Sequence, residues 1–203
     1  MAFLGIKIPH EVGRLLKSIE VPGKKEPDSE YHITIAFFGD DWPVSDAAKT
    51  LETTFETLKN FKPFKVKTQK ITCFPKGEGG GVPILAKVES EELHKLEKKL
   101  KAAYDKEDIE FSKTHKDFKP HITLSYSGKE IDEEKIEPIE FMVHEIVLWC
   151  GDNGDDRLFV TFPLDGKQKK NAFLINKAEV FYALAKDPKA FFKQTTDRRL
   201  IVR

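Results

Sequence analysis

The chain has 203 residues, and its 34 Lys and Arg balance 34 Asp and Glu, so the formal net charge is zero. Hydrophobic residues make up 39% and charged residues 33%, a composition that excludes disordered, collagen-like and disulfide-scaffold proteins. No segment approaches the roughly 18 uncharged residues of a membrane span, and the two cysteines, Cys73 and Cys150, imply no disulfide framework, so we expect a cytoplasmic protein with one core.

The chain begins with a strand over residues 2–8, and the apolar residues after Pro9 have helical spacing. Those residues are Val12, Leu15, Leu16 and Ile19. A polar run over residues 23–30 predicts a loop, and the apolar residues 31–38 predict the next strand. The opening order is therefore strand, helix, loop and strand.

Ser45 can cap a second helix whose apolar face is Ala47, Leu51, Phe55 and Leu58. Residues 64–74 and 82–88 read as two strands, and the Gly-rich stretch 76–81 between them favours a hairpin. Ser90 can cap a third helix, with Leu93, Leu96, Leu100, Ala103 and Tyr104 forming its apolar stripe.

The strand predicted over residues 120–126 follows that helix. Two last strands, 139–149 and 157–163, enclose Asn153-Gly154, a dipeptide typical of tight hairpin turns.

This order repeats within the chain. His32-Ile-Thr34-Ile corresponds to His121-Ile-Thr123-Leu at an offset of 89 residues, and residues 63–85 correspond to 138–160 at an offset of 75, which pairs Phe74 with Trp149. Two copies of roughly 80 residues are too few and too long for a solenoid. We therefore predict an α+β fold, bilobal with pseudo-two-fold symmetry, in which two antiparallel sheets flanked by helices surround a central cleft.

Pseudo-symmetry would bring His32 and His121 to opposite sides of that cleft. Thr34 and Thr123 would accompany them, because residues i and i+2 of a strand share a face. Imidazoles have a reference pKa of about 6.5, so one can act as a base while the other acts as an acid. The threonine hydroxyls could donate hydrogen bonds to non-bridging phosphate oxygens as charge grows on them.

A single His-x-Thr in a strand is uninformative, since a pair of polar residues is common on the exposed face of a strand without any catalytic role. Two copies at equivalent places of a repeat favour the functional interpretation. A module that only binds phosphate would have no need of two titratable groups and could use Arg or Lys instead.

These two motifs make the chain resemble the two-histidine (2H) phosphoesterase superfamily, and in particular RNA 2′,3′-cyclic phosphodiesterases, also called 2′-5′ RNA ligases. The resemblance covers residues 1–163, a duplicated domain of approximately 1–81 and 82–163, and leaves 164–203 as a basic C-terminal extension. It implies catalytic His32 and His121, phosphate ligands Thr34 and Thr123, and phosphoric diester hydrolysis without a metal or other cofactor.

The implied substrate is a nucleotide or RNA end, as a phosphodiester or 2′,3′-cyclic phosphate. Two alternatives stay open: a phage-type nuclease that degrades cyclic-oligonucleotide immune signals, and a non-catalytic nucleotide-binding or phosphate-binding module. Phe37 and Tyr126 follow the motifs and could flank the cleft, where a base can stack on an aromatic ring. Lys119 could attract a phosphate. For all three, an ordinary structural or solvated role is at least as good an interpretation.

The remaining histidines carry less information. His144 has Gln69 at its equivalent position in the first copy, which argues against catalysis, and no zinc-ligand spacing occurs. The extension holds ten Lys and Arg against four Asp and Glu from residue 164 onward. Its aromatic residues predict self-docking or a homo-oligomer contact, and residues 200–202 could add a strand.

Overall fold

The computed structural model describes residues 1–40, 42, 47–76, 81–113, 117–150, 158–164, 174–175 and 199–202. The strands in these residues are β1 (Ala2–Lys7), β2 (Lys24–Lys25), β3 (His32–Gly39), β4 (Phe64–Cys73), β5 (Val82–Glu89), β6 (His121–Ser127), β7 (Glu134–Val143), β8 (Glu145–Cys150), β9 (Leu158–Pro163), β10 (Leu174–Ile175) and β11 (Arg199–Val202). The helices are α1 (His10–Ser18), α2 (Ala47–Leu58) and α3 (Glu91–Lys106), with a 3₁₀ turn at Asp28–Glu30.

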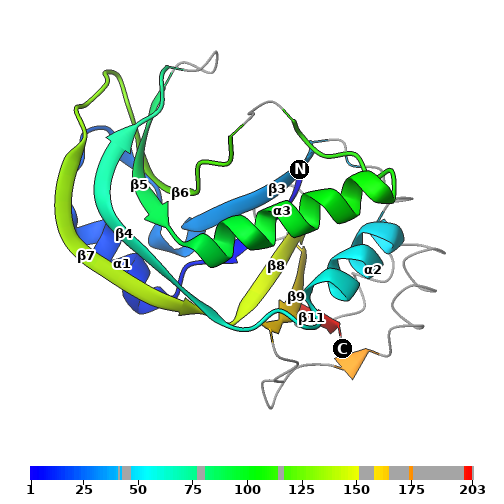
Figure 1. Ribbon diagram of the computed structural model, residues 1–203. Coiled ribbons are helices and arrows are strands. Elements are labelled where there is room, and N and C mark those ends of the chain that lie inside the picture. Colours follow the sequence, from blue (N-terminus) through cyan, green and yellow to red (C-terminus); the bar gives the residue numbers. More distant parts are fainter. Residues whose placement is uncertain are drawn as a thin grey trace.

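The strands form two sheets. Sheet A has the order β10-β11-β9-β8-β1-β3, and sheet B has the order β2-β6-β5-β4-β7. Neighbours are antiparallel throughout sheet B and from β9 to β3 in sheet A. Figure 1 shows that sheet B is strongly curved. The predicted α+β fold with two antiparallel sheets and flanking helices is confirmed.

One predicted strand is wrong. Residues 139–149 do not form a single strand, because the chain leaves sheet B after β7 and enters sheet A as β8. The break falls at His144, whose carbonyl accepts a hydrogen bond from the Leu164 backbone amide at 2.9 Å. His144 is thus exposed between two strands rather than in the middle of one.

Each sheet takes strands from both copies of the repeat. In sheet A, β8 of the second copy pairs with β1 of the first, and in sheet B, β4 of the first copy pairs with β5 of the second. The two sheets therefore do not coincide with residues 1–81 and 82–163. Removing either copy would remove strands from both sheets.

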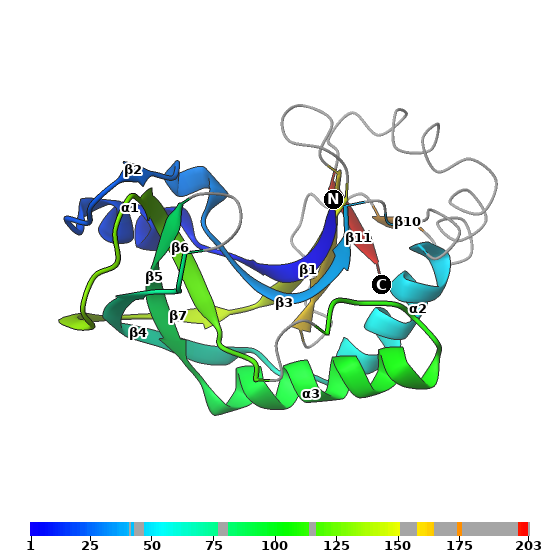
Figure 2. The ribbon, with the colours of Figure 1, turned by 90° about the horizontal axis from the view of Figure 1, so that it is seen from above.

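The helices also link the two sheets. The Ser90 hydroxyl accepts a hydrogen bond from the Leu93 amide and caps α3 as predicted, and α3 contacts both β3 and β4. Figures 1 and 2 show α2 beside α3, with α1 on the far side of the molecule near β2. In α1, Val12 and Leu16 are buried but Leu15 is 55% exposed, so the predicted stripe was too wide.

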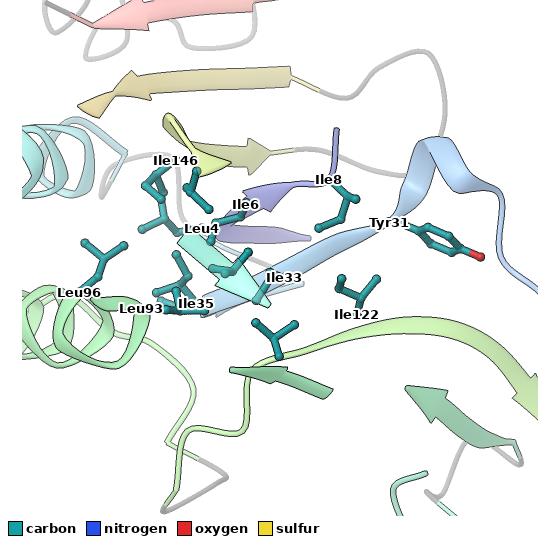
Figure 3. Packing of buried hydrophobic residues seen from close by; sticks show 14 of the residues in the cluster. Leu4, Ile6, Ile8, Tyr31, Ile33, Ile35, Leu93, Leu96, Ile122 and Ile146 are labelled. Carbon is teal, nitrogen blue, oxygen red and sulfur yellow. The ribbon is translucent and has the colours of Figure 1, made fainter. Parts of the chain in front are cut away.

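Side chains from both sheets share one hydrophobic core. Leu4, Ile33 and Ile35 of sheet A gather with Leu93 and Leu96 of α3, all 2% exposed or less (Figure 3). Ile122 of sheet B belongs to the same cluster. Because this core spans both sheets, it fixes how the two sheets meet.

A buried hydroxyl pair joins α2 to α3. Thr54 Oγ1 donates its only hydrogen to the Thr50 carbonyl at 2.6 Å. In the 2.7 Å hydrogen bond between Thr54 Oγ1 and the Tyr104 hydroxyl, Tyr104 is therefore the donor. Burial raises the pKa of Tyr104 far above its ordinary value. The tyrosine hydroxyl is therefore a buried donor that depends on Thr54.

We expect Thr54→Val to be more destabilising than Tyr104→Phe. The first change leaves the buried tyrosine O–H without an acceptor, at a cost of about 1–3 kcal/mol, whereas the second loses a neutral hydrogen bond of about 1 kcal/mol. Urea unfolding of the two variants measures the difference. Equal stabilities would show that this donor finds another partner.

The end of the chain adds strands to sheet A. β11 pairs in parallel with β9, and β10 pairs with β11, so a strand does form over the residues expected to add one. The sequence of the extension also predicts a short helix over residues 178–185 and a further turn over 189–193. These elements, the Ser45 cap and the Asn153-Gly154 turn lie outside the described residues. The partner of the extension stays a prediction.

Candidate active site

His32 and His121 are the first residues of β3 and β6, the strands at which the two sheets meet. β3 and β6 contact each other, and the next residue in each strand, Ile33 or Ile122, is fully buried in the shared core. Side chains alternate across a strand, so both histidines lie on faces turned away from that core. Both rings are half-buried.

The two motifs have the same register and the same irregularity. In β3, His32 pairs with Lys7 and Thr34 with Gly5; in β6, His121 pairs with Lys87 and Thr123 with Leu85. A bulge follows each threonine and skips one residue of the register, Ile35 in the pairing of β3 with β1 and Leu124 in the pairing of β6 with β5. Bulges are common next to active sites, where they redirect side chains.

Each imidazole makes the same backbone hydrogen bond. Nδ1 of His32 lies 2.7 Å from the Glu30 carbonyl, and Nδ1 of His121 lies 2.7 Å from the Lys119 carbonyl. A carbonyl only accepts, so Nδ1 carries a hydrogen and donates it. Nε2 is then the nitrogen that gains or loses a proton in both rings.

Aromatic rings pack against both imidazoles. Phe74 meets the His121 ring edge to face, with centroids 4.7 Å apart, and Trp149 lies 5.9 Å from the His32 ring. Phe3 stacks on Trp149 and lies 4.8 Å from His32. The pairing of Phe74 with Trp149 by the repeat is therefore seen in space.

The rings beside His32 are more deeply buried than Phe74, the half-buried ring beside His121. Phe3 and Trp149 are 4% and 5% exposed, so they support His32 rather than offer an open surface for a base. A Cβ on Gly5 would collide with the Ile33 carbonyl and lie 3.3 Å from the Trp149 ring. The missing side chain of Gly5, which pairs with Thr34, therefore leaves room for the Trp149 ring.

Because of the bulges, Phe37 lies on the same face of β3 as His32, and Tyr126 lies on the same face of β6 as His121. Phe37 pairs with Phe3, and Tyr126 pairs with Pro83. Phe37 is half-buried in the cluster of Phe3 and Trp149, whereas Tyr126 is 50% exposed. Burial, and then the charge of Glu26, raises the pKa of the Tyr126 hydroxyl. Of the two predicted base-stacking residues, Tyr126 has the more accessible ring.

Lys119 has an exposed side chain and meets His121 through its carbonyl. Two other lysines escaped the sequence reasoning: Lys7 and Lys87 lie directly across from the two histidines. A signal existed, because an alignment of the strand predicted over residues 2–8 with the end of the strand predicted over 82–88 places Lys7 against Lys87. Directly paired side chains lie about 4.5–5.5 Å apart at Cβ.

The other histidines do not join this site. His10, the first residue of α1, lies 3.7 Å from the Asp28 carboxylate, and His94 contacts Phe118. Among the residues that the structure describes, no three His, Cys, Asp or Glu side chains are grouped as metal ligands. No helix in the described part of the chain is long and apolar enough to cross a bilayer.

Two mainly antiparallel sheets, one of them strongly curved, that meet at a pair of His-x-Thr strands define a fold of the 2H phosphoesterase type. The profile of the 2′-5′ RNA ligase superfamily matches residues 23–155, which include both motifs. That match covers more than half of the chain, and the chain belongs to this superfamily.

Solved structures share the fold. The crystal structure of TT0787 from Thermus thermophilus has a TM-score of 0.66 and 22% identity, covering 82% of this chain and 99% of that one. Escherichia coli LigT complexed with 3′-AMP has a TM-score of 0.59 and 16% identity, covering 80% and 96%. A structure described as a phosphoesterase has a TM-score of 0.58 and 17% identity, covering 80% and 97%. A search among curated proteins gives no match.

Proposed function

We propose that this protein is a phosphodiesterase that cleaves a nucleotide or RNA phosphodiester, or a 2′,3′-cyclic phosphate, by two-histidine acid and base catalysis. The observation that carries the proposal is the equivalence of the two motifs. Both imidazoles are held by a carbonyl at 2.7 Å, both begin strands at the sheet junction, and both have a threonine on the same face.

In the proposed reaction, Nε2 of one neutral imidazole takes a proton from an attacking water. The water oxygen forms a bond to phosphorus while the bond to the leaving ribose oxygen breaks, and Nε2 of the protonated second imidazole gives that oxygen its proton. Thr34 and Thr123 donate hydrogen bonds to the non-bridging oxygens. The product is a phosphomonoester, and the protonation states of the two rings are exchanged.

The relatives support a nucleotide phosphate as the ligand. LigT has been crystallised with 3′-AMP, phosphate, ATP and NADP+, all of which carry phosphate, the group that two imidazoles and two hydroxyls would bind here. Tyr126, half-exposed on the His121 face, is the best placed described residue to stack on a base.

The two alternative functions predict different products. A nuclease for cyclic oligonucleotides would linearise a 3′-5′ cyclic dinucleotide and ignore a 2′,3′-cyclic mononucleotide. A binding module would bind these nucleotides and return them unchanged. Incubation with each substrate, followed by chromatography and ³¹P NMR of the products, tests the proposed function against both.

We expect catalysis to survive EDTA. The proposed acid, base and hydrogen-bond donors are all protein side chains, so chelation removes nothing that they need. The test compares initial rates before and after dialysis against EDTA. A rate that falls with EDTA and returns with zinc or magnesium would require a metal-assisted mechanism instead.

A further inference from the structure

Three lysines lie in one row across sheet B and lead to His121. Lys87 on β5 pairs with His121 on β6, Lys70 on β4 pairs with Lys87, and Lys135 on β7 pairs with Lys70. Directly paired residues project from the same face of a sheet. The row of Lys87, Lys70 and Lys135 therefore extends about 14 Å from His121, at about 4.8 Å for each strand.

One carboxylate lies against this lysine row. Glu133 accepts a hydrogen bond from Lys70 at 2.6 Å. That bond, together with the charges of Lys70, Lys87 and Lys135, holds the pKa of Glu133 below its ordinary value. The protein thus already places one anion where all three cations act on it.

The excess of positive charge is local. Three lysines against Glu133 leave the row itself with a surplus of two positive charges, in a chain whose formal net charge is zero, and Glu89 is a further carboxylate whose charge acts on Lys70. Further along β4, the lysines are matched by carboxylates: Lys65 bonds Glu140 at 2.9 Å, and Lys67 pairs with both Glu89 and Glu140. The surplus lies in the row that contains His121.

Sheet A has no such row in the described residues around His32. There Lys7 pairs with His32, but the pairing of β1 with β8 does not continue the row beyond Lys7, and the other neighbours on the same face are the buried rings of Phe3 and Trp149. The two motifs share a lysine across from the histidine, but only on sheet B does the row continue, through Lys70 and Lys135. An anionic chain is therefore favoured along sheet B.

We propose that the lysine row binds the phosphates of a single-stranded oligonucleotide whose reacting phosphate lies at His121 and whose chain displaces Glu133 from Lys70. The direction of the chain rests on the proposed function, because that function places the reacting phosphate at His121. A stacked strand rises about 3.4 Å per nucleotide, so about four nucleotides separate His121 from Lys135. A mononucleotide bound at His121 does not reach Lys135.

The first test measures binding without reaction. The probe is a fluorescein-labelled 2′-O-methyl RNA of about six nucleotides, titrated by anisotropy at several salt concentrations. Lys135→Gln should weaken binding about two- to fivefold and lower the slope of log K against log salt by about 0.7. Glu133→Gln should strengthen binding by a similar factor, whereas Lys98→Gln, a control for an exposed lysine on α3, should bind like wild type.

The second test compares substrate lengths. For an RNA of about six nucleotides ending in a 2′,3′-cyclic phosphate, Lys135→Gln should lower kcat/KM about two- to fivefold. The same variant should cleave a 2′,3′-cyclic mononucleotide at the wild-type rate. Equal losses on both substrates would contradict a remote phosphate site.

The two proposals fail in different ways. If Lys135→Gln and Glu133→Gln bind the 2′-O-methyl RNA like wild type, the lysine row is not a phosphate site, even if the enzyme cleaves cyclic phosphates. If wild type cleaves no phosphodiester but binding responds to both variants as predicted, the lysine row stands and the proposed function falls.

Discussion

Replacing either His32 or His121 with alanine is expected to lower phosphodiester turnover by about 100- to 10,000-fold, the range for the loss of a general acid or base. In the proposed mechanism each imidazole carries a proton on one side of the reacting phosphorus. The two groups would then act as one unit, so the double variant should lose little more than either single variant. Initial rates on a 2′,3′-cyclic nucleotide measure the loss.

The matched control is His144→Ala. His144 is exposed between β7 and β8, outside the candidate site, and its variant should keep the wild-type rate. All the histidine variants should melt close to wild type, because both site histidines lie on the faces opposite the core. An active double variant, or a loss of rate that follows a loss of fold, would contradict the assigned roles.

Thr34→Val and Thr123→Val should each slow the reaction about 10- to 1000-fold, the scale found when a donor to a charged transition state is removed. Valine keeps the β-branched shape that suits a strand and removes only the hydroxyl. The loss should fall mainly on kcat, since the proposed mechanism has these hydroxyls donate as charge develops on the phosphate oxygens.

Serine at the same positions is the rescue variant, because it restores the hydroxyl. Thr34→Ser and Thr123→Ser should recover most of the rate that valine loses. Steady-state kinetics of the four variants decide the point. Wild-type rates for both valine variants would show that the motif threonines have only a structural role in their strands.

The sequence was sufficient to predict the elements that depend on local periodicity. The α3 helix with its Ser90 cap and the strands that carry His32 and His121 follow from short-range spacing. The equivalence of Phe74 and Trp149 followed from the internal repeat. The structure then shows each of these rings beside a histidine, at 4.7 and 5.9 Å.

What could not be predicted depends on which strands become neighbours. The break at His144 sends one apolar run into two sheets, and both of its halves look like strand in isolation. Leu15 has the spacing of the α1 stripe, yet it is 55% exposed. The short strand β2, in a run predicted as a loop, exists because Lys24 and Lys25 pair with Tyr126 and Ser125.

The lysine row shows the same limit for the site. Lys70, Lys87 and Lys135 are far apart in the chain, and only the registers of β4, β5 and β7 bring them into line with His121. Periodicity reports which face a residue occupies but not which residue lies across from it. Cross-strand partners of a catalytic residue therefore require the sheet order.

The most direct test of the central claim is a product assay of wild type and the His32→Ala/His121→Ala variant in EDTA. The substrates are a 2′,3′-cyclic nucleotide, a 2′-5′ oligoadenylate and a 3′-5′ cyclic dinucleotide. We predict that wild type converts at least one of them to a phosphomonoester or a linear product and that the double variant converts none. Binding of all three without conversion by wild type, or equal conversion by the double variant, would contradict two-histidine catalysis at this site.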